Sequence, residues 1–402
     1  MPDHHPGVSV SGSNRPRFHF TPTSGWINDP YGVTWHDGRY HLFFQHLPGQ
    51  VSWAPEQHWG HAVSDDLLRW TEHEVVLSPD DIDGGIWSGS VVRTDSGDGR
   101  MFYTAVRVDH PQIGVVRAAR PADPSWNVWH KEATVAAPPE GLRLAAFRDP
   151  YVLHDGHQWR MLVGAGTPDG TALALSWTSP DLDTWSYVGV LASRPSSSVD
   201  PVWTGTVWEC PQLFQVGSAW VLVVSVWAEH QTRYEAYAVG DLVDGKFMPR
   251  AWRRLTYGPG HYAGSAFTDN DGRPCLLHWL RDVVDPERGW AGAHSVSHVL
   301  SLQGDRLLAE PHPVVAFAAE PLPPGTARRI GRANLQLDDD VLAVEIDSQR
   351  WTMPCRGGPV RLLVDGPVVE IFGPEGVAAF AVGPRTDPAL STGSPSVRAA
   401  RT

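Results

Sequence analysis

The stretch DPYGVTWHDGRYHLFF at residues 29–44 sets the pattern for most of this 402-residue chain. It consists of an apolar segment, a turn rich in Asp and Gly, and a second apolar segment, which together are typical of a β-hairpin. The same layout returns at residues 89–104, 149–163, 210–224 and 264–279. The starts of these segments are 60, 60, 61 and 54 residues apart, so the chain contains five repeats of similar length.

A period of about 50 to 60 residues built from hairpins is typical of the blades of a β-propeller. We therefore predict an all-β fold in which residues 19–310 form a five-bladed β-propeller. The alternative is a β-sandwich array whose hairpins share similar turns, and the regular spacing tells against it. Residues 310–325 contain five prolines and predict a connector. Short apolar segments beyond it predict a small β-sandwich over residues 326–384.

Composition excludes several classes of partner. The net charge is −13, with 32 Lys and Arg against 45 Asp and Glu, so we expect no nucleic-acid partner. The longest mainly apolar run, residues 219–228, is far shorter than the roughly 18 to 20 residues that span a bilayer, and we expect no membrane contact.

Residues 1–18 lack the apolar core of a signal peptide, which favours a cytoplasmic location. The three cysteines are widely spaced and are expected to be free thiols. Nothing in the sequence indicates an oligomeric state.

Three carboxylates stand at nearly equivalent places in three of the repeats. Asp29 and Asp149 begin the first and third repeats, and Glu209 immediately precedes the fourth. Because the first strand of each propeller blade lines the central channel, we expect the three side chains to meet at one mouth of that channel. The one-residue offset of Glu209 counts against this, since successive side chains of a strand point to opposite faces. Glycoside hydrolysis requires such an arrangement, with one carboxylate to attack and one carboxylic acid to protonate the leaving oxygen.

Neighbouring residues indicate a role for each carboxylate. Arg148 precedes Asp149, and its positive charge would keep Asp149 ionised as a charge stabiliser. Apolar neighbours on both sides of Glu209 suit a general acid/base. Asn28 could hold a nucleophilic Asp29 in place by a hydrogen bond. The alternative for both aspartates is that they only shape turns ahead of proline.

These segments resemble glycoside hydrolase family 32, the β-fructofuranosidase family of invertases, levanases and inulinases. WINDPYG at residues 26–32 is similar to the family's WMNDPNG box, and residues 148–150 and 209–211 are similar to its RDP and ECP boxes. The resemblance extends from residue 18 to about residue 380 and includes VEIF at residues 369–372, which is similar to a signature of the family's second domain. It implies a five-bladed propeller followed by a β-sandwich. It also implies that Asp29 is the nucleophile, Asp149 the transition-state stabiliser and Glu209 the acid/base.

The resemblance also implies that the protein uses no cofactor. It further implies a set of residues that contact the sugar. For each aromatic member, a plain core role is the alternative. The expected substrate-binding residues are Trp26, Asn28, Gln45, Trp53, Trp87, Ser88, Arg148 and Trp279.

Four histidines raise the question of a metal site. His41, His46, His58 and His61 lie close together in sequence but lack the carboxylate partner of a known zinc pattern. We therefore predict that the protein uses no metal.

Residues 260 and 261 depart from the family pattern. Gly260 stands where the family commonly has an acidic residue, and His261 stands where it has an aromatic one. We expect the pair to border the leaving-group side of the pocket, with His261 in contact with the substrate and able to tune Glu209. The terminal domain is also short for the family, with 93 residues from Glu310 to the end.

Together these features predict a retaining exo-β-fructosidase acting on a small-molecule carbohydrate. It would release terminal β-D-fructofuranosyl residues from sucrose, fructo-oligosaccharides or fructans through a covalent intermediate. Two alternatives stay open. One is a fructosyltransferase that uses the same residues, and the other is a sugar-binding propeller without turnover.

Overall fold

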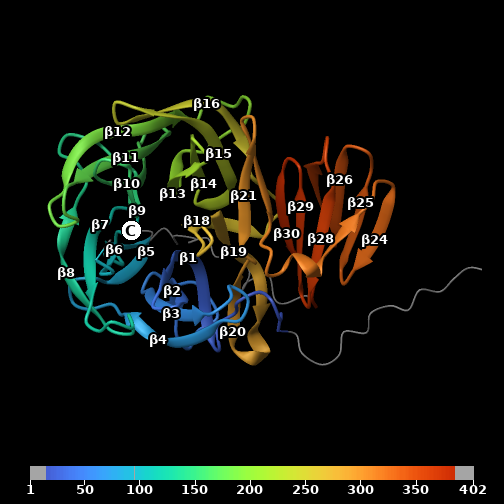
Figure 1. Ribbon diagram of the computed structural model, residues 1–402, viewed down its shortest axis with the longest axis horizontal. Coiled ribbons are helices and arrows are strands. Elements are labelled where there is room, and N and C mark those ends of the chain that lie inside the picture. Colours follow the sequence, from blue (N-terminus) through green and yellow to red (C-terminus); the bar gives the residue numbers. More distant parts are fainter. Residues whose placement is uncertain (1–14, 95, 385–402) are drawn as a thin grey trace, which may run out of the picture.

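The computed structural model describes residues 15–94 and 96–384, and these residues form an all-β protein with two three-residue 3₁₀ helices. Figure 1 shows a ring of blades with a two-sheet sandwich beside it. No helix among the described residues has the length and apolarity needed to cross a bilayer. All three cysteines are buried and unpaired, as the sequence predicts. Residues 1–14, which include most of the segment behind the expected cytoplasmic location, lie outside the described part.

Four blades are antiparallel sheets whose strands follow chain order from the innermost outward. Blade 1 consists of β1 (Gly25–His36), β2 (Arg39–Leu47), β3 (His58–Ser64) and β4 (Thr71–Leu77). Blade 2 consists of β5 (Gly85–Arg93), β6 (Gly99–Val106), β7 (Val115–Pro121) and β8 (Trp129–Ala136). Blade 3 consists of β9 (Ala146–His154), β10 (Trp159–Gly166), β11 (Thr171–Ser179) and β12 (Ser186–Pro195). Blade 4 consists of β13 (Val207–Val216), β14 (Ala219–Ala228), β15 (Gln231–Val243) and β16 (Lys246–Arg254).

The fifth blade closes the ring through an inserted strand. Its four main strands are β18 (His261–Thr268), β19 (Pro274–Asp285), β21 (His298–Gln303) and β22 (Arg306–Pro311). The 3₁₀ helix η1 (Pro286–Arg288) leads from β19 into the inserted strand β20 (Trp290–His294). Strand β20 pairs antiparallel with β19 and parallel with β1. The last blade is thereby hydrogen-bonded to the first.

Two sheets form the sandwich, and one of them borrows a strand from the propeller segment. The first sheet contains β17 (Thr256–Tyr257), β30 (Gly376–Ala381), β29 (Val368–Gly373), β28 (Val360–Asp365) and β23 (Ala319–Leu322). The second contains β24 (Thr326–Ile330), β25 (Ala333–Leu337), β26 (Val341–Ile346) and β27 (Gln349–Pro354). The expectation that residues 310–325 form only a connector is wrong, because this stretch includes η2 (Ala316–Ala318) and all of β23.

Apolar side chains fill the space between adjacent blades. Leu162 of blade 3 packs in one buried cluster with Leu213 and Leu222 of blade 4. Because each blade is covered on both faces, its middle strands are apolar along nearly their whole length, which accounts for the apolar run in β14. The innermost strands β1, β5, β9, β13 and β18 contact one another around the ring. This packing fixes the relative positions of side chains that are far apart in sequence.

Candidate active site

Every innermost strand carries a register irregularity near its start. The pairing shifts between Ile27 and Pro30, Trp87 and Gly89, Arg148 and Tyr151, Glu209 and Gln212, and Tyr262 and Ser265. Such β-bulges re-aim side chains that a regular strand would send to alternate faces. Asp29, Asp149 and Glu209 lie in or next to these bulges and line one cavity. The one-residue offset of Glu209 therefore does not prevent the three carboxylates from meeting.

Asp29 is held by two polar neighbours. The Asn28 amide donates to its Oδ1 at 3.0 Å, and the Ser88 hydroxyl donates to its Oδ2 at 2.5 Å. The Cys210 thiol lies 3.6 Å from the same Oδ2. Burial raises the pKa of Asp29 to about 6, the Ser88 bond acts in the opposite direction, and the negative charge of Glu209 adds to the rise.

Asp149 is held by a backbone amide and by a hydroxyl group. The Cys210 amide donates to its Oδ2 at 3.0 Å, and its own amide donates to the Thr104 hydroxyl at 2.7 Å. Burial raises the pKa of Asp149 to about 7; Arg148 opposes this, while Glu209 and Asp29 add to it. Asp149 and Cys210 both adopt left-handed backbone, with φ of 64° and 45°. Strain of this kind is common where a site over-determines the position of a side chain.

Glu209 has polar surroundings, which corrects two sequence expectations. Arg148 Nη2 donates to its Oε1 at 2.7 Å, and the Tyr262 hydroxyl donates to its Oε2 at 2.5 Å. Trp208 is fully buried and directs its indole nitrogen to Thr204, so the apolar neighbour in sequence is not the environment of the carboxylate. Arg148 Nε lies 3.8 Å from Asp149 Oδ2, so the guanidinium pairs more closely with Glu209 than with Asp149. The Glu209 side chain is 16% exposed against 6% for Asp149, which leaves it accessible to a leaving group and to water.

Most of the expected substrate-binding residues do line this cavity. They are Asn28, Gln45, Trp53, Trp87, Ser88, Arg148 and Trp279. The Asn28 side-chain amide also donates to Gln45 Oε1 at 2.6 Å, which fixes the orientation of both side-chain amides. Trp53 and Trp87 meet edge to face, with ring centroids 5.9 Å apart. Trp26 lies outside this lining: it is buried and its indole nitrogen donates to Asn28 Oδ1 at 3.2 Å, so it positions Asn28 instead.

Five further residues line or hold the site, and the sequence analysis did not assign them a role. They are Gln112, Cys210, Trp227, Thr232 and Tyr262. Tyr262 had a detectable signal, because it stands two residues before the fifth repeat, close to the positions that the carboxylates occupy in theirs. Gln112 accepts from Arg148 Nη1 at 2.5 Å and comes from a loop that follows blade 2's second strand. No repeat position marks that loop.

The expectation that His261 contacts the substrate is wrong. His261 is 1% exposed and its Nε2 lies 2.8 Å from Glu370 Oε1 of the sandwich. It lies on the face of β18 away from the cavity, whereas the next residue, Tyr262, faces into it. A Cβ on Gly260 would lie only 2.5 Å from the carbonyl oxygen of Ala379. The departure at residues 260 and 261 is therefore part of the interface between propeller and sandwich.

The four histidines considered for a metal do not converge on one point. His41 Nδ1 lies 3.0 Å from His61 Nε2, while His58 contacts the Ser78 hydroxyl. His46 is directed to the Trp26 carbonyl oxygen.

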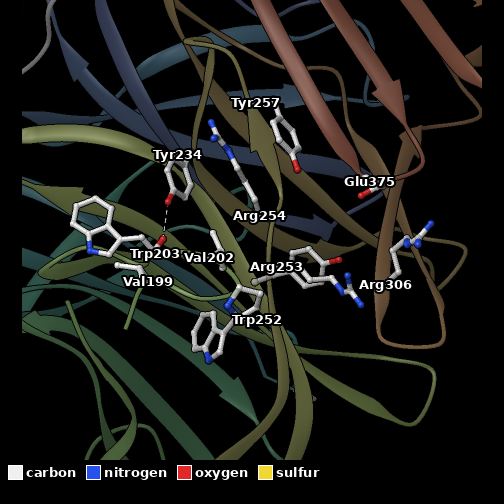
Figure 2. A pocket seen from close by; sticks show the side chains of 12 residues that line it. Val199, Val202, Trp203, Tyr234, Trp252, Arg253, Arg254, Tyr257, Arg306 and Glu375 are labelled. Carbon is white, nitrogen blue, oxygen red and sulfur yellow. Dashed lines mark hydrogen bonds between the residues drawn. The ribbon is translucent and has the colours of Figure 1, made fainter. Parts of the chain in front are cut away.

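A second cavity lies between blade 4 and the sandwich (Figure 2). The Arg254 guanidinium covers the rings of Tyr234 and Tyr257 at 4.1 and 4.7 Å from their centroids. Among the described residues, Glu375 is the one carboxylate that lines it. Two-carboxylate chemistry is therefore possible in the channel cavity and not here.

Comparison with known proteins places these observations in a family. The model of the Glycosyl hydrolases family 32 N-terminal domain matches residues 19–311. A sucrose-6-phosphate hydrolase of Escherichia coli is 32% identical over 318 residues, which cover 74% of this chain and 64% of that protein. The β-fructofuranosidase insoluble isoenzyme 1 of Oryza sativa subsp. indica is 35% identical over 345 residues, which cover 76% of this chain and 57% of that protein. The chain thus spans less than two thirds of the length of these relatives.

Solved structures agree with the fold. A β-fructofuranosidase of Bombyx mori superposes with a TM-score of 0.78 at 23% identity, over 93% of this chain and 90% of that one. A sucrose-6-phosphate hydrolase from Lactobacillus gasseri superposes with a TM-score of 0.77 at 23% identity, over 96% of this chain and 91% of that one. The predicted all-β fold, a five-bladed propeller followed by a sandwich, is confirmed.

Proposed function

Because the chain belongs to glycoside hydrolase family 32, we propose that it is a retaining exo-β-fructosidase that releases terminal β-D-fructofuranosyl residues. One observation carries the proposal: Asp29, Asp149 and Glu209 share one cavity walled by aromatic and amide side chains. Aromatic faces suit the apolar side of a sugar ring, and the amides suit its hydroxyl groups.

In the proposed mechanism, Asp29 attacks the anomeric carbon while Glu209 protonates the leaving oxygen. Asn28 and Ser88 hold the two oxygens of Asp29, so the attacking carboxylate is oriented before substrate binds. Asp149 stabilises the positive charge that develops on the sugar. Glu209 then removes a proton from water, which attacks the fructosyl–Asp29 ester and frees the nucleophile.

Burial and the neighbouring charges together let the site retain a proton for the first step. Burial is the main cause of the pKa of Asp29 at about 6 and of Asp149 at about 7, and repulsion from the other carboxylates adds to both. We infer that Glu209 delivers the proton to the leaving oxygen, because its side chain is 16% exposed against 6% for Asp149, and because Asn28 and Ser88 already hold both oxygens of Asp29.

A neutral fructoside fits the cavity better than a phosphorylated one. Among the described residues that line it, Arg148 is the single cation, and its guanidinium already bonds to Glu209 and Gln112. A substrate phosphate would therefore lie beside carboxylates without a cation of its own. We propose sucrose, a fructo-oligosaccharide or a fructan as the substrate class.

The test is to incubate the protein with sucrose, sucrose 6-phosphate, inulin, levan and a short fructo-oligosaccharide and to identify the released sugars by chromatography. Free fructose from the unphosphorylated substrates is expected. Longer fructosyl products at high substrate concentration would indicate transfer instead, and binding without any product would indicate a sugar-binding propeller. Addition of methanol should give methyl β-fructofuranoside if the configuration is retained.

Variants identify the residues responsible. Asp29→Asn and Glu209→Gln should each lower turnover by several orders of magnitude with the circular dichroism spectrum unchanged. Glu209→Gln should recover partly with a substrate whose leaving group needs no protonation, and Asp29→Asn should not. Asp37→Asn, an exposed change in the turn of the same hairpin, is the matched control and should be as active as the parent. Full activity in either site variant would remove that residue from the mechanism.

A further inference from the structure

Three histidines converge at the boundary between blade 5 and the sandwich. They are His261 on β18, His278 on β19 and His298 on β21, and each offers a ring nitrogen within 4.8 Å of the others. Glu235 on β15 and Glu370 on β29 lie against them. We call these five residues the interface cluster. Figure 1 shows β18, β19 and β21 where the ring meets the sandwich.

The cluster is shut off from solvent. All five side chains are 0% exposed. Glu370 Oε1 lies 2.8 Å from His261 Nε2 and 3.1 Å from His298 Nε2. Glu235 Oε2 lies 3.0 Å from His278 Nε2. The rings therefore stand between two carboxylates.

Several polar atoms of the cluster have no hydrogen-bond partner. These atoms are the Nδ1 of His261, His278 and His298, together with His278 Nε2 and Glu235 Oε2. The last two lie at hydrogen-bond distance but do not have the geometry of a hydrogen bond. An unsatisfied buried polar group costs about 1 to 3 kcal/mol, and folded proteins contain few of them. Five such atoms in one enclosed cluster point to a ligand that contacts them.

The charges of the cluster favour a cation. Glu370 is fully buried and its Oε1 contacts two of the rings, while the fully buried Glu235 contacts the third. Among the described residues, Glu235 has one ion-pair partner, His278.

Nearby charged residues do not supply the balance. His19, whose pKa hydrogen bonds to Asp365 and Glu370 raise to about 9 against the effect of burial, contacts both of those carboxylates and so offsets one charge of two. Arg281 directs its guanidinium to Thr232 and to the backbone oxygens of Arg233 and His261. Glu235 and Glu370 thus lie against three imidazole rings in a dry environment, where a buried charge needs a close partner.

We propose that the interface cluster binds one divalent transition-metal ion, with Zn²⁺ as the expected occupant. One ring nitrogen from each of the three histidines would provide three ligands of a kind that zinc prefers, and Glu235, whose Oε2 lies 3.0 Å from His278 Nε2, would stand beside the ion with its negative charge. Glu370 would stay beside the ion as a hydrogen-bonded partner of the rings, the arrangement that orients metal-bound imidazoles in proteins. The ion would join strands β18, β19 and β21 of blade 5 at the surface where the sandwich packs.

The proposed ion would also lie directly behind one wall of the active-site cavity. Tyr262 and Trp279, which line the cavity, directly follow His261 and His278 in the chain. Strands β18 and β19 therefore present one face to the cavity and the other to the ion. The role is structural, because the ion lies behind the cavity wall and out of reach of the reacting atoms.

The first experiment measures the metal in the purified full chain after incubation with ZnSO₄ and gel filtration, by plasma mass spectrometry. About one zinc per chain is expected. Extraction with dipicolinate should remove the zinc and lower the melting temperature, and Zn²⁺ should restore it. Titration of the extracted protein with CoCl₂ should give the visible absorption of tetrahedral Co²⁺ and saturate at one equivalent.

Variants then locate the ion. His278→Gln and His298→Gln should each bind less than a tenth of the parent's zinc, while His41→Gln, which changes a buried histidine of blade 1, should bind the full amount. If a cluster variant fails to fold, the cobalt titration of the parent still decides the question. Folded parent protein that takes up neither metal would overturn the proposal, as would unchanged zinc content in folded His278→Gln and His298→Gln variants.

Discussion

Replacement of Ser88 by alanine should move the acid limb of the pH profile to higher pH. The Ser88 hydroxyl donates to Asp29 Oδ2 at 2.5 Å and stabilises the ionised form of this carboxylate. Burial and the charge of Glu209 oppose it and leave the pKa of Asp29 at about 6. Because the proposed nucleophile and Asp149 must both be ionised, kcat/KM of the parent should fall below about pH 7 through Asp149 and more steeply below about pH 6 through Asp29.

The size of the shift follows from the hydrogen bond. A hydrogen bond to a charged group contributes about 1.5 to 3 kcal/mol, and one pKa unit corresponds to about 1.4 kcal/mol. Loss of the Ser88 bond should therefore raise the pKa of Asp29 by about one to two units. At pH 5.5 the ionised fraction then falls roughly tenfold or more, whereas at pH 9 the loss is much smaller.

The assay is kcat/KM on one fructoside from pH 4.5 to 9 for the parent, Ser88→Ala and Ser90→Ala. Ser90 is the matched control, because it lies on the same strand and its hydroxyl accepts from the Val152 amide instead of contacting a carboxylate. Its acid limb should coincide with that of the parent. An acid limb of Ser88→Ala within 0.2 pH units of the parent would show that Asp29 does not control this limb. The break that belongs to Asp29 is expected to move by at least about one unit.

Three further predictions concern other parts of the site and its support. Asp149→Asn should abolish turnover yet raise the melting temperature at pH 8. The pKa of Asp149, about 7, lies above the ordinary 3.8, so the free energy of unfolding falls as pH rises between these values. Asparagine removes this loss, which amounts to up to about 4 kcal/mol. An unchanged or lower melting temperature in calorimetry at pH 8 would contradict the reasoning. Tyr262→Phe, which loses the bond to Glu209, should lower kcat about 10- to 100-fold with KM nearly unchanged, and steady-state kinetics in which only KM rises would argue for a substrate contact instead. Gly260→Ala should lower stability in urea by about 1 to 3 kcal/mol through its close approach to Ala379 without moving the pH profile, and a moved profile would return residue 260 to the active site.

The repeats carried most of the fold prediction. Spacing of the hairpins predicted five blades, since every blade must bury both faces in the same way, and the equivalent positions of Asp29 and Asp149 predicted their meeting. The bulge at Glu209 could not be read from local sequence, because a bulge depends on how two strands pair.

Interpretation of single neighbours was less successful. Trp208 adjoins Glu209 in sequence but points to the core, and Arg148 adjoins Asp149 but pairs more closely with Glu209. Alternation along a strand separates residues that are consecutive in the chain. The prediction for His261 rested on its place against the family pattern, and alternation also defeats it: Tyr262 faces the cavity, while the His261 imidazole points to Glu370, more than a hundred residues later.

The parallel pairing of β20 with β1 has a consequence for the order of events during synthesis. Asp29 lies on β1, the strand against which the final blade closes, whereas Asp149 and Glu209 lie in the middle of the ring. A nascent chain that has emerged as far as blade 4 already contains all three carboxylates, but the strand that carries the nucleophile has no partner on its closing side. The proposed active site is therefore assembled at the end of translation of the propeller, when residues 290–294 reach β1, and a ribosome-bound chain shorter than this holds all three carboxylates without an assembled site.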